Sequence, residues 1–85
     1  MSARRNDFEI MAEILQIAKG GAKRTKIVYR ANINFKLLKY YIEELEKADL
    51  IKVDGEIKTT EKGKGFLNCY RDLMNFVSAK PAIMA

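Results

Sequence analysis

Residues 50–59 differ from the rest of the chain because their apolar side chains alternate with polar ones. Such alternation is typical of short β-strands, and the two halves of the segment flank Asp54-Gly55, a common turn sequence. A two-residue loop would pair Val53 with Glu56, whereas a three-residue loop, Asp54-Gly55-Glu56, pairs Val53 with Ile57. We therefore predict a hairpin with the longer loop. Its apolar face carries Ile51, Val53 and Ile57, and its other face carries Lys52 and Lys58.

Two segments before the hairpin have apolar residues three and four positions apart, as amphipathic helices do. The first begins at Asn6 or Asp7, either of which can cap it, and runs to about Lys19, where Gly20-Gly21 ends it. Its predicted buried side chains are Ile10, Met11, Ile14, Leu15, Ile17 and Ala18. A short second helix, residues 26–30, follows Thr25 as its N-cap residue.

Two further helices lie on either side of the hairpin. Asn34 caps a predicted third helix from Phe35 to about Ala48. The apolar residues on its inward side are Leu37, Leu38, Tyr41, Ile42, Leu45 and Ala48. Thr60 caps a predicted final helix, residues 61–79, and Pro81 is expected to stop it because proline lacks the amide donor that a helix uses.

This order of elements predicts a fold that is mainly α with a small β-hairpin. The second and third helices with their tight turn form a helix-turn-helix, and the hairpin that follows is its wing. We expect a single winged-helix domain over residues 1–85, because a chain of this length has no room for a second domain. Within it, residues 7–59 form the winged helix-turn-helix core and residues 60–79 form a C-terminal dimerisation helix.

Positive charge is concentrated in the helix-turn-helix segment. The net charge is +5, yet residues 1–40 hold nine Lys or Arg against three Asp or Glu, and residues 41–85 hold seven against eight. Residues 19–39 contain seven basic residues and no acidic one. Two interpretations remain open here: a solvated basic surface, or a binding surface for a polyanion, which for a basic domain is usually nucleic acid.

The charges of the third helix are ordered against its own dipole. Lys36 and Lys39 lie in its first turns and three glutamates follow from Glu43 onward, although a helix dipole favours anions at the N-terminus. An ion pair between Lys39 and Glu43 would also have the poorer orientation for that spacing. A DNA-binding helix-turn-helix explains the order, because the N-terminal part of its recognition helix enters the major groove. The predicted base-contacting residues are Asn34, Lys36, Lys39 and Tyr40.

Basic residues around the second helix are predicted to contact phosphates, because this helix crosses the DNA backbone in helix-turn-helix complexes. Thr25 and the free amide groups at the helix start are expected to add an anion contact. On the wing, Lys52 and Lys58 are the available cations, whereas acidic residues at its tip would repel phosphate. The predicted phosphate contacts are Lys23, Arg24, Thr25, Lys26, Arg30, Lys52 and Lys58.

Little in the sequence predicts catalysis or a bound cofactor. Histidine is absent and Cys69 is the single cysteine, which excludes an intramolecular disulfide and removes the usual ligands of a zinc site. The glutamates of the third helix fit a charged helix face, and Gly20-Gly21 lacks the spacing of a phosphate-binding loop. We expect no enzyme, cofactor, metal or small-molecule substrate. Cys69 has apolar neighbours and is predicted to be a small core residue.

The final helix carries more apolar surface than its own domain needs. From Phe66 to Val77, eight of twelve residues are apolar or aromatic and cover half of the helix circumference, whereas packing on one side uses a stripe of about 100°. One stripe, Leu67, Tyr70, Met74 and Val77, is predicted to cover the core. The other, Phe66, Cys69, Leu73 and Phe76, has the spacing of a coiled-coil seam and predicts a homodimer. The alternative is that the first helix covers both stripes within one chain.

Three stretches of the chain resemble small archaeal winged-helix DNA-binding proteins. They are KGGAKRTKIVYRANINF (residues 19–35), LKYYIEELEKADLI (38–51) and TTEKG (59–63), and the resemblance covers residues 7–78. That family includes the ten-kilodalton "10a" chromatin proteins of Sulfolobus and related predicted transcription regulators. The resemblance implies a homodimer joined by its C-terminal helices as an antiparallel coiled coil, with DNA bound at the winged-helix ends. By position, the groove helix is residues 34–47 and the wing is residues 53–57.

Two features depart from that family. The C-terminal helix is shorter than in the chromatin proteins, and Asp49 stands where the family usually has glycine before Leu-Ile. The second departure requires a left-handed backbone at a residue that has a side chain, which aspartate tolerates moderately.

The sequence therefore predicts a dimeric winged-helix protein that binds double-stranded DNA, either as a transcription regulator or as a chromatin-associated protein. The alternative is a winged-helix module for protein–protein contact without DNA binding. We expect a cytoplasmic, nucleoid-associated location. A membrane span needs about 18 consecutive apolar residues, and no apolar run approaches that length. The first residues also lack the apolar core of a signal peptide.

Overall fold

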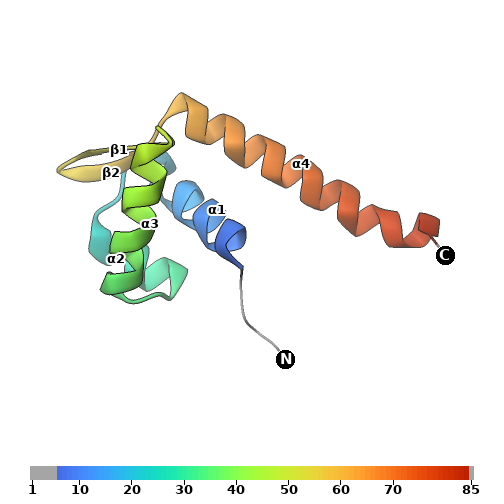
Figure 1. Cartoon of the computed structure of the whole chain (residues 1–85), viewed down its shortest axis with the longest axis horizontal. Coiled ribbons are helices and arrows are strands. Elements are labelled where there is room, and N and C mark those ends of the chain that lie inside the picture. The colour runs from blue at the N-terminus through green and yellow to red at the C-terminus, as the bar shows by residue number, and fades with distance from the viewer. Residues whose placement is uncertain (1–5, 85) are drawn as a thin grey trace.

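The structure, a computed structural model, describes the backbone of residues 6–84 and the side chains of residues 6–76. Its elements are α1 (Asp7–Ile17), the 3₁₀ turn η1 (Ala18–Gly20), α2 (Arg24–Ala31), α3 (Phe35–Lys47), β1 (Ile51–Asp54), β2 (Glu56–Thr59) and α4 (Glu61–Met84). The first three helices form a body with the hairpin at one end, and α4 leaves this body as a long helix (Figure 1). The predicted fold class, a winged helix-turn-helix followed by a C-terminal helix, is confirmed.

The core lies where the first three helices, the hairpin and the start of α4 meet. Its largest fully buried side chains are Ile14, Leu15, Ile27, Leu38, Leu45, Ile51 and Ile57. Among the described side chains of α4, Leu67 is buried in this core. The hydroxyl of Thr59 donates a hydrogen bond to the carbonyl oxygen of Leu15 (2.6 Å), which joins the hairpin to α1.

The predicted apolar stripes are confirmed at their centres and wrong at their edges. In α1, Met11 and Ile17 are only half-buried, while Ala12, outside the predicted stripe, is buried. In α3, Leu37 and Ala48 are exposed. Leu37 lies at the margin of the inward face, and Ala48 is the C-cap residue after the last helical turn. Neither position is turned toward the core.

Side-chain caps start three of the helices where the sequence predicts them. Asn6 accepts a hydrogen bond from the amide of Glu9 (2.8 Å), and the Glu9 side chain accepts one from the amide of Asn6 (2.9 Å), which forms a capping box. The Asn34 side-chain oxygen accepts a hydrogen bond from the amide of Leu37 (2.7 Å). Thr60 caps α4 through its hydroxyl oxygen in the same way.

The predicted cap at Thr25 is wrong. α2 covers residues 24–31 and begins after Lys23, whose side chain makes no capping hydrogen bond. Just before this helix, Ala22 forms two backbone hydrogen bonds with Ile57 of the hairpin (2.9 and 2.8 Å). A tertiary contact thus holds the chain where α2 begins, and a local capping pattern contains no information about it.

The predicted hairpin register is confirmed. Val53 pairs with Ile57, and Asp54 pairs with Glu56 across Gly55, whose φ is 78°. The covered face carries Ile51 and Ile57, which are buried, and Val53, which is half-buried, while Lys52 and Lys58 lie on the exposed face. A one-residue shift would exchange these faces, so the apolar pattern fixes the register.

α3 ends in a left-handed turn at Asp49, whose φ is 64°. Its amide donates to the carbonyl of Glu46 (3.0 Å) and the amide of Leu50 donates to the carbonyl of Leu45 (2.9 Å), which together form a Schellman motif. The left-handed aspartate that the sequence predicts is therefore present. The Thr60 hydroxyl donates to the carbonyl of Asp49 (2.7 Å) and ties the end of α3 to the start of α4.

Two predictions for α4 are wrong. The helix continues through Pro81 to Met84 instead of ending at Ala79. Proline removes one amide donor and crowds the carbonyl four residues earlier, which weakens a helix but does not end this one. Cys69 is exposed and is not a core residue, because α4 turns Leu67, and in part Phe66 and Tyr70, toward the core.

Candidate nucleic-acid interface

The helix-turn-helix consists of α2, a tight turn and α3. Asn32 takes a left-handed conformation (φ 58°), and the amide of Ile33 donates to the carbonyl of Val28 (3.2 Å), so the chain reverses within a few residues. Ile27, Ala31 and Leu38 of the two helices are buried. This packing uses one side of α3 and leaves the opposite side exposed at the surface of the body.

Three of the four predicted base-contacting side chains lie on that exposed side of α3. Lys36 and Lys39 are exposed, and Tyr40 is half-exposed. The Tyr40 ring contacts the Tyr41 ring edge-on, with centroids 5.2 Å apart. Tyr41 is buried and its hydroxyl donates to the carboxylate of Asp7 (2.7 Å). The Tyr40 ring thus rests against a buried ring that is itself hydrogen-bonded to α1.

Asn34, the fourth predicted base contact, has a structural task. Its side-chain oxygen accepts the amide hydrogen bond of Leu37 and caps α3. Recognition of adenine by asparagine uses both the oxygen and the NH₂ group of the side chain at once. The cap fixes the direction of this oxygen, which restricts the two-point contact with adenine and leaves the NH₂ group of Asn34 to donate toward DNA.

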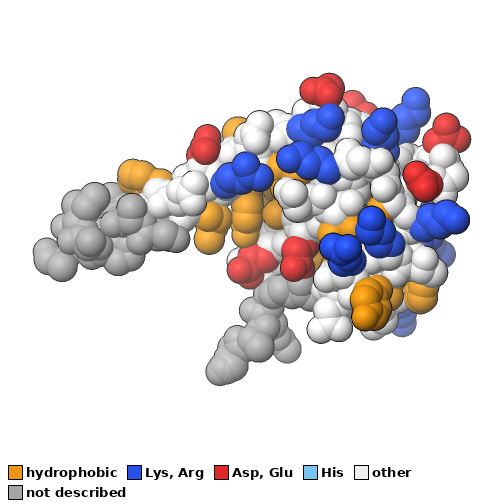
Figure 2. All heavy atoms as spheres, turned by 180° about the vertical axis from the view of Figure 1, so that it is seen from behind, with side chains coloured by type: hydrophobic (Ala, Val, Ile, Leu, Met, Phe, Trp, Pro, Cys, Tyr) orange, Lys and Arg blue, Asp and Glu red, His pale blue; other side chains and the backbone are white. Residues whose placement is uncertain are grey.

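The predicted phosphate contacts around α2 are all exposed: Lys23, Arg24, Thr25, Lys26 and Arg30. Because α2 begins at Arg24, Thr25 lies in the first turn and not at the cap position. Figure 2 shows Lys and Arg side chains spread over the body of the molecule, with apolar side chains between some of them. The structure therefore places these side chains at the surface, in the helix that precedes α3.

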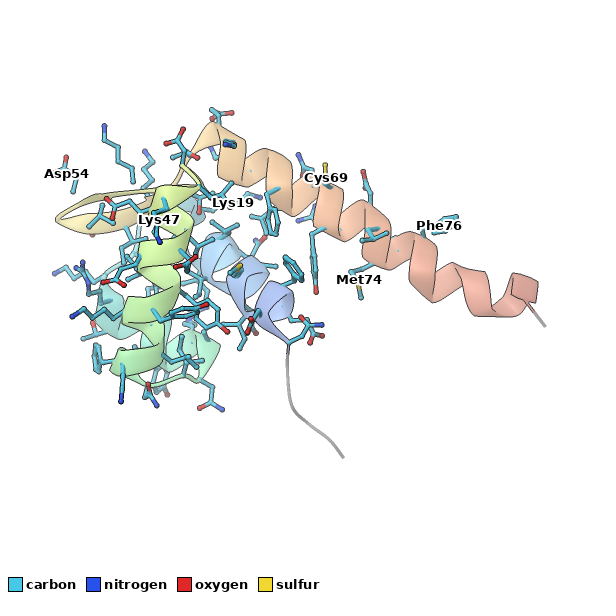
Figure 3. All side chains as sticks on the ribbon, viewed as in Figure 1. Lys19, Lys47, Asp54, Cys69, Met74 and Phe76 are labelled. Atoms are coloured by element: carbon cyan, nitrogen blue, oxygen red, sulfur yellow. The ribbon has the colours of Figure 1, made fainter. Side chains whose placement is uncertain are left out.

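The wing lysines have a different electrostatic environment. Lys52 and Lys58 border a shallow hollow that Asp54 and Glu56 also line. Asp54 lies at the tip of the hairpin (Figure 3). Carboxylates at these positions lower the positive potential of the wing, which supports the expectation that its tip contributes little to anion binding.

The ion pairs that the described side chains form do not involve the basic residues of segment 19–39. Across residues 6–76, the side-chain ion pairs are Lys47–Glu44 (3.4 Å) and Lys64–Glu61 (3.3 Å). The ion pair between Lys39 and Glu43, which was the other explanation for the charge order of this helix, is not among them. The basic residues of the segment 19–39 are therefore available to an external anion.

Two exposed aromatic side chains of the helix-turn-helix, besides Tyr40, are not predicted by the sequence pattern. Tyr29 of α2 and Phe35 of α3 are exposed, with 85% and 55% of their surface accessible. Helical spacing identifies residues that face the core, but it gives no separate signal for an aromatic ring that faces water. Composition offers one hint, since aromatic residues interleaved with basic ones are typical of nucleic-acid-binding surfaces.

The residues predicted to form a dimer seam lie along α4, apart from this surface. Cys69, Leu73 and Phe76 are exposed, whereas Phe66 is half-buried against the core and stacks near Tyr70, with ring centroids 6.3 Å apart. Of the stripe predicted to cover the core, Leu67 is buried, Tyr70 is half-buried and Met74 is exposed. Val77 lies outside the residues whose side chains are described.

A groove of about 420 Å³ separates the start of α1 from α4. Its apolar lining includes Phe8 of α1 and Phe66, Tyr70, Leu73 and Met74 of α4. In Figure 3, Phe76 projects from α4 beyond the body, farther along the helix than Met74. The first helix therefore does not cover the second apolar stripe of α4.

Within the described part of the chain, no group of three or more His, Cys, Asp or Glu side chains is placed to hold a metal ion. Among the helices that the structure describes, none combines the length and the apolarity that crossing a membrane requires. The surface of the helix-turn-helix carries exposed cations and exposed aromatic rings.

These features match a known family. The model of the winged helix-turn-helix family matches residues 4–78, so the chain belongs to this family. A relative from Methanocaldococcus jannaschii, an uncharacterized protein, is 34% identical over 80 residues, which are 92% of this chain and 82% of the relative.

Among solved structures, the chain is similar to Sso10a-2, a DNA-binding protein from Sulfolobus solfataricus. The TM-score is 0.77 at 28% sequence identity, and the match covers 94% of each chain. The resemblance to small archaeal winged-helix proteins that the sequence predicts is confirmed.

Proposed function

We propose that this chain binds double-stranded DNA by inserting the N-terminal half of α3 into the major groove. The observation that carries the proposal is the exposed basic surface of residues 23–39, whose cations have no ion-pair partner among residues 6–76. The acidic residues of α3 all lie after its first two turns. The half of the helix that faces DNA in a helix-turn-helix complex is therefore free of negative charge.

The side chains divide by task in this proposal. Lys36, Lys39 and Tyr40, with the NH₂ group of Asn34, face the base edges, where lysine donates to acceptors such as the O6 and N7 atoms of guanine. The cations of α2 bind phosphates and set the position of the protein without reading sequence. The similarity to Sso10a-2, a DNA-binding protein, supports DNA binding as the function.

We further propose that the protein acts as a homodimer joined by α4. The helix leaves the body and presents Cys69, Leu73 and Phe76 to solvent, beside the apolar groove at Phe8. Apolar surface of this extent is rare on monomers and is typical of subunit contacts. Residues 7–59 would then be the DNA-binding unit of a single domain and residues 60–79 its dimerisation helix. Two-fold symmetry would present two copies of α3 to one DNA or to two.

The biological role that fits these properties is transcription regulation or the organisation of chromatin. Both roles use a dimer of winged helices, and they differ in sequence preference. A regulator binds one site far more tightly than random DNA, whereas a chromatin protein binds both similarly.

Protein–protein contact without DNA is the second function that a specific observation favours. Exposed aromatic residues such as Tyr29 and Phe35 occur at protein interfaces as well as at DNA surfaces. The density of unpaired lysines in the same area argues against it, because lysine is depleted from protein interfaces.

Titration of labelled duplex DNA at several salt concentrations tests the proposed function. If a dimer contacts about five phosphates, log K falls with log salt with a slope of about −4 to −5, so a fourfold rise in salt weakens binding about 500-fold. The single variants Lys36→Ala and Lys39→Ala should each weaken binding, and Lys62→Ala at the start of α4 is a charge-matched control for each of them. Absence of binding at low salt, or affinity that salt does not change, would exclude DNA as the ligand.

A further inference from the structure

The large apolar side chains that the structure exposes fall into two groups. The first belongs to the surface proposed for dimerisation and consists of Phe8, Leu73, Met74 and Phe76. The second lies on the helix-turn-helix and consists of Tyr29, Phe35, Leu37 and Tyr40. Dimerisation through α4 does not account for the second group, which stands among the basic side chains of α2 and α3.

Phe35 is the most informative member of this group. It is the first residue of α3, and 55% of its surface is exposed. The core contribution of α3 comes from residues 38–45. Folding gains little from this ring, because a phenylalanine left mostly in water realises only a part of the stabilisation that full burial provides. Phenylalanine is also an ordinary helix former with no advantage at this position.

Helical spacing pairs the exposed rings with lysines. Residues four apart lie next to each other on a helix surface, with Cβ atoms about 5–6 Å apart. Phe35 is therefore the neighbour of Lys39, and Lys36 is the neighbour of Tyr40. Each of these two pairs combines an aromatic surface with an ammonium group. Both pairs lie in the half of α3 that enters the groove under the proposed function.

Thymine is the base whose major-groove edge carries a matching pair of groups. It presents its C5 methyl group next to the O4 atom, a hydrogen-bond acceptor. Cytosine presents an amino donor in place of O4 and has no methyl group, so an ammonium group finds no acceptor there. Guanine offers acceptors to lysine but no apolar surface to a ring.

We propose that Phe35 and Lys39 together recognise thymine in the major groove. The ring covers the C5 methyl group, and the ammonium group donates a hydrogen bond to O4. This inference rests on the proposed function, since it requires α3 to lie in the groove of a duplex. It adds a preference for A·T pairs at the positions that Phe35 meets to a surface whose lysines alone would favour the acceptor atoms of guanine.

Replacing thymine by uracil tests the pair, because uracil keeps O4 and its pairing with adenine and lacks only the methyl group. A mixed-sequence duplex rich in A·T pairs is made with thymidine and with 2′-deoxyuridine at every thymine position. The unmodified protein should bind the thymine duplex about fourfold more tightly for each methyl group that a Phe35 ring covers, as expected for burial of one methyl group. The Phe35→Ala variant should bind both duplexes equally.

Two further variants make the result specific. Tyr29→Ala removes the other widely exposed ring of the helix-turn-helix and should keep the preference for thymine. Phe35→Leu retains apolar surface and should keep a part of it. Circular dichroism checks that each variant is folded, and the unmodified protein tests the preference without any variant.

The outcomes separate the two proposals. Equal binding of the unmodified protein to both duplexes overturns the thymine pair and leaves DNA binding intact. A thymine preference that survives in Phe35→Ala also overturns it, because another residue would then contact the methyl group. Tighter binding to single strands than to duplex would assign the rings to stacking on unpaired bases and overturn it as well. No binding to either duplex at low salt would overturn the proposed function itself.

Discussion

The helix-turn-helix face and the outer part of α4 both expose large apolar side chains, but different charges surround them. Tyr29, Phe35 and Tyr40 stand among exposed lysines and arginines of residues 23–39. Leu73 and Phe76 lie in a stretch, residues 66–76, whose charged residues are Arg71 and Asp72 alone. An apolar side chain among unpaired cations fits a polyanion that carries apolar groups, whereas one in a nearly neutral stretch fits another apolar surface.

The two regions also differ in how the fold supports them. The N-terminal half of α3 is seated on the core by Leu38 and Tyr41, and the Tyr41 hydroxyl is bound to Asp7 of α1. The outer part of α4 extends beyond the body (Figure 1), and its Leu73 and Phe76 side chains are more than half exposed. A supported surface suits recognition of a defined shape. An extended helix gains support when a second copy packs against it.

The largest expected effect comes from placing charge in the apolar stripe of α4. Leu73→Lys with Phe76→Lys should convert the proposed dimer into a monomer, since two lysines in a coiled-coil seam leave buried charges without partners. DNA affinity should fall about hundredfold, because linked sites bind more tightly than single ones by about 10²–10⁴. Sedimentation measures the mass, and DNA titration measures the affinity.

A matched control adds the same charge on the polar side of the same helix. Asn68→Lys with Asn75→Lys changes two exposed residues of α4 and should leave both mass and DNA affinity nearly unchanged. If the unmodified protein sediments as a monomer at micromolar concentration, the proposal that the apolar side of α4 is a dimer contact is wrong.

The second effect concerns Gly63, at the junction of the two regions. A Cβ atom at this position would overlap the carbonyl oxygen of Leu50 and lie 2.6 Å from the Thr59 methyl carbon. Gly63→Ala should therefore lower the free energy of unfolding by about 1–3 kcal/mol, the usual cost of overpacking. Urea denaturation measures this change.

Gly65 provides the comparison, because a Cβ atom there meets nothing within 4 Å. Gly65→Ala should raise the free energy of unfolding by about 0.5–1 kcal/mol, since alanine is the better residue inside a helix. Equal effects of the two substitutions would mean that α4 does not pack against the wing as closely as the structure places it.

A third, smaller effect separates the cations of α3 from those of α2. Lys36→Ala with Lys39→Ala should weaken binding to a preferred site about tenfold more than binding to random DNA, if these residues face the bases as proposed. Arg24→Ala should weaken both about equally and reduce the salt slope by about one unit for each phosphate that the variant no longer binds. Equal losses on both DNAs for the lysine variant would indicate binding of the chromatin type, without base recognition.

The sequence predicts those parts of the molecule that depend on local pattern. Alternation in residues 50–59 is enough for the hairpin register, and the caps at Asn6, Asn34 and Thr60 follow from side chains that bond to nearby amides. It fails where distant residues decide. The start of α2 depends on the bonds between Ala22 and Ile57, which no local pattern encodes.

The predicted site shows the same division. Helical spacing places Lys36 and Lys39 on the outward side of α3 correctly, since a periodic pattern identifies both faces of a helix. It does not show that the Asn34 oxygen is engaged as a cap, nor that the Phe35 ring stays in water. Both depend on the position of the helix start relative to the core. Cys69 fails for a related reason, because its apolar neighbours in sequence face different directions on α4.

The smallest expected effect concerns Asp49. Substitutions there should change the free energy of unfolding and leave the helix-turn-helix face and the outer part of α4 unaltered. Asp49 holds a left-handed conformation (φ 64°) at the end of α3, and its carbonyl accepts the Thr60 hydroxyl. A left-handed backbone costs most residues about 1–2 kcal/mol and aspartate somewhat less, while glycine adopts it without steric cost. Asp49→Gly should therefore raise the free energy of unfolding by about 0.5 kcal/mol after the greater flexibility of unfolded glycine is subtracted. Asp49→Ala, which keeps a Cβ atom and lacks the tolerance of aspartate, should lower it. Denaturation measures both changes, and DNA affinity and sedimentation should be unaltered in both. If Asp49→Gly changes DNA affinity instead, the end of α3 takes part in binding, and the basic face extends farther along the helix than its charges indicate.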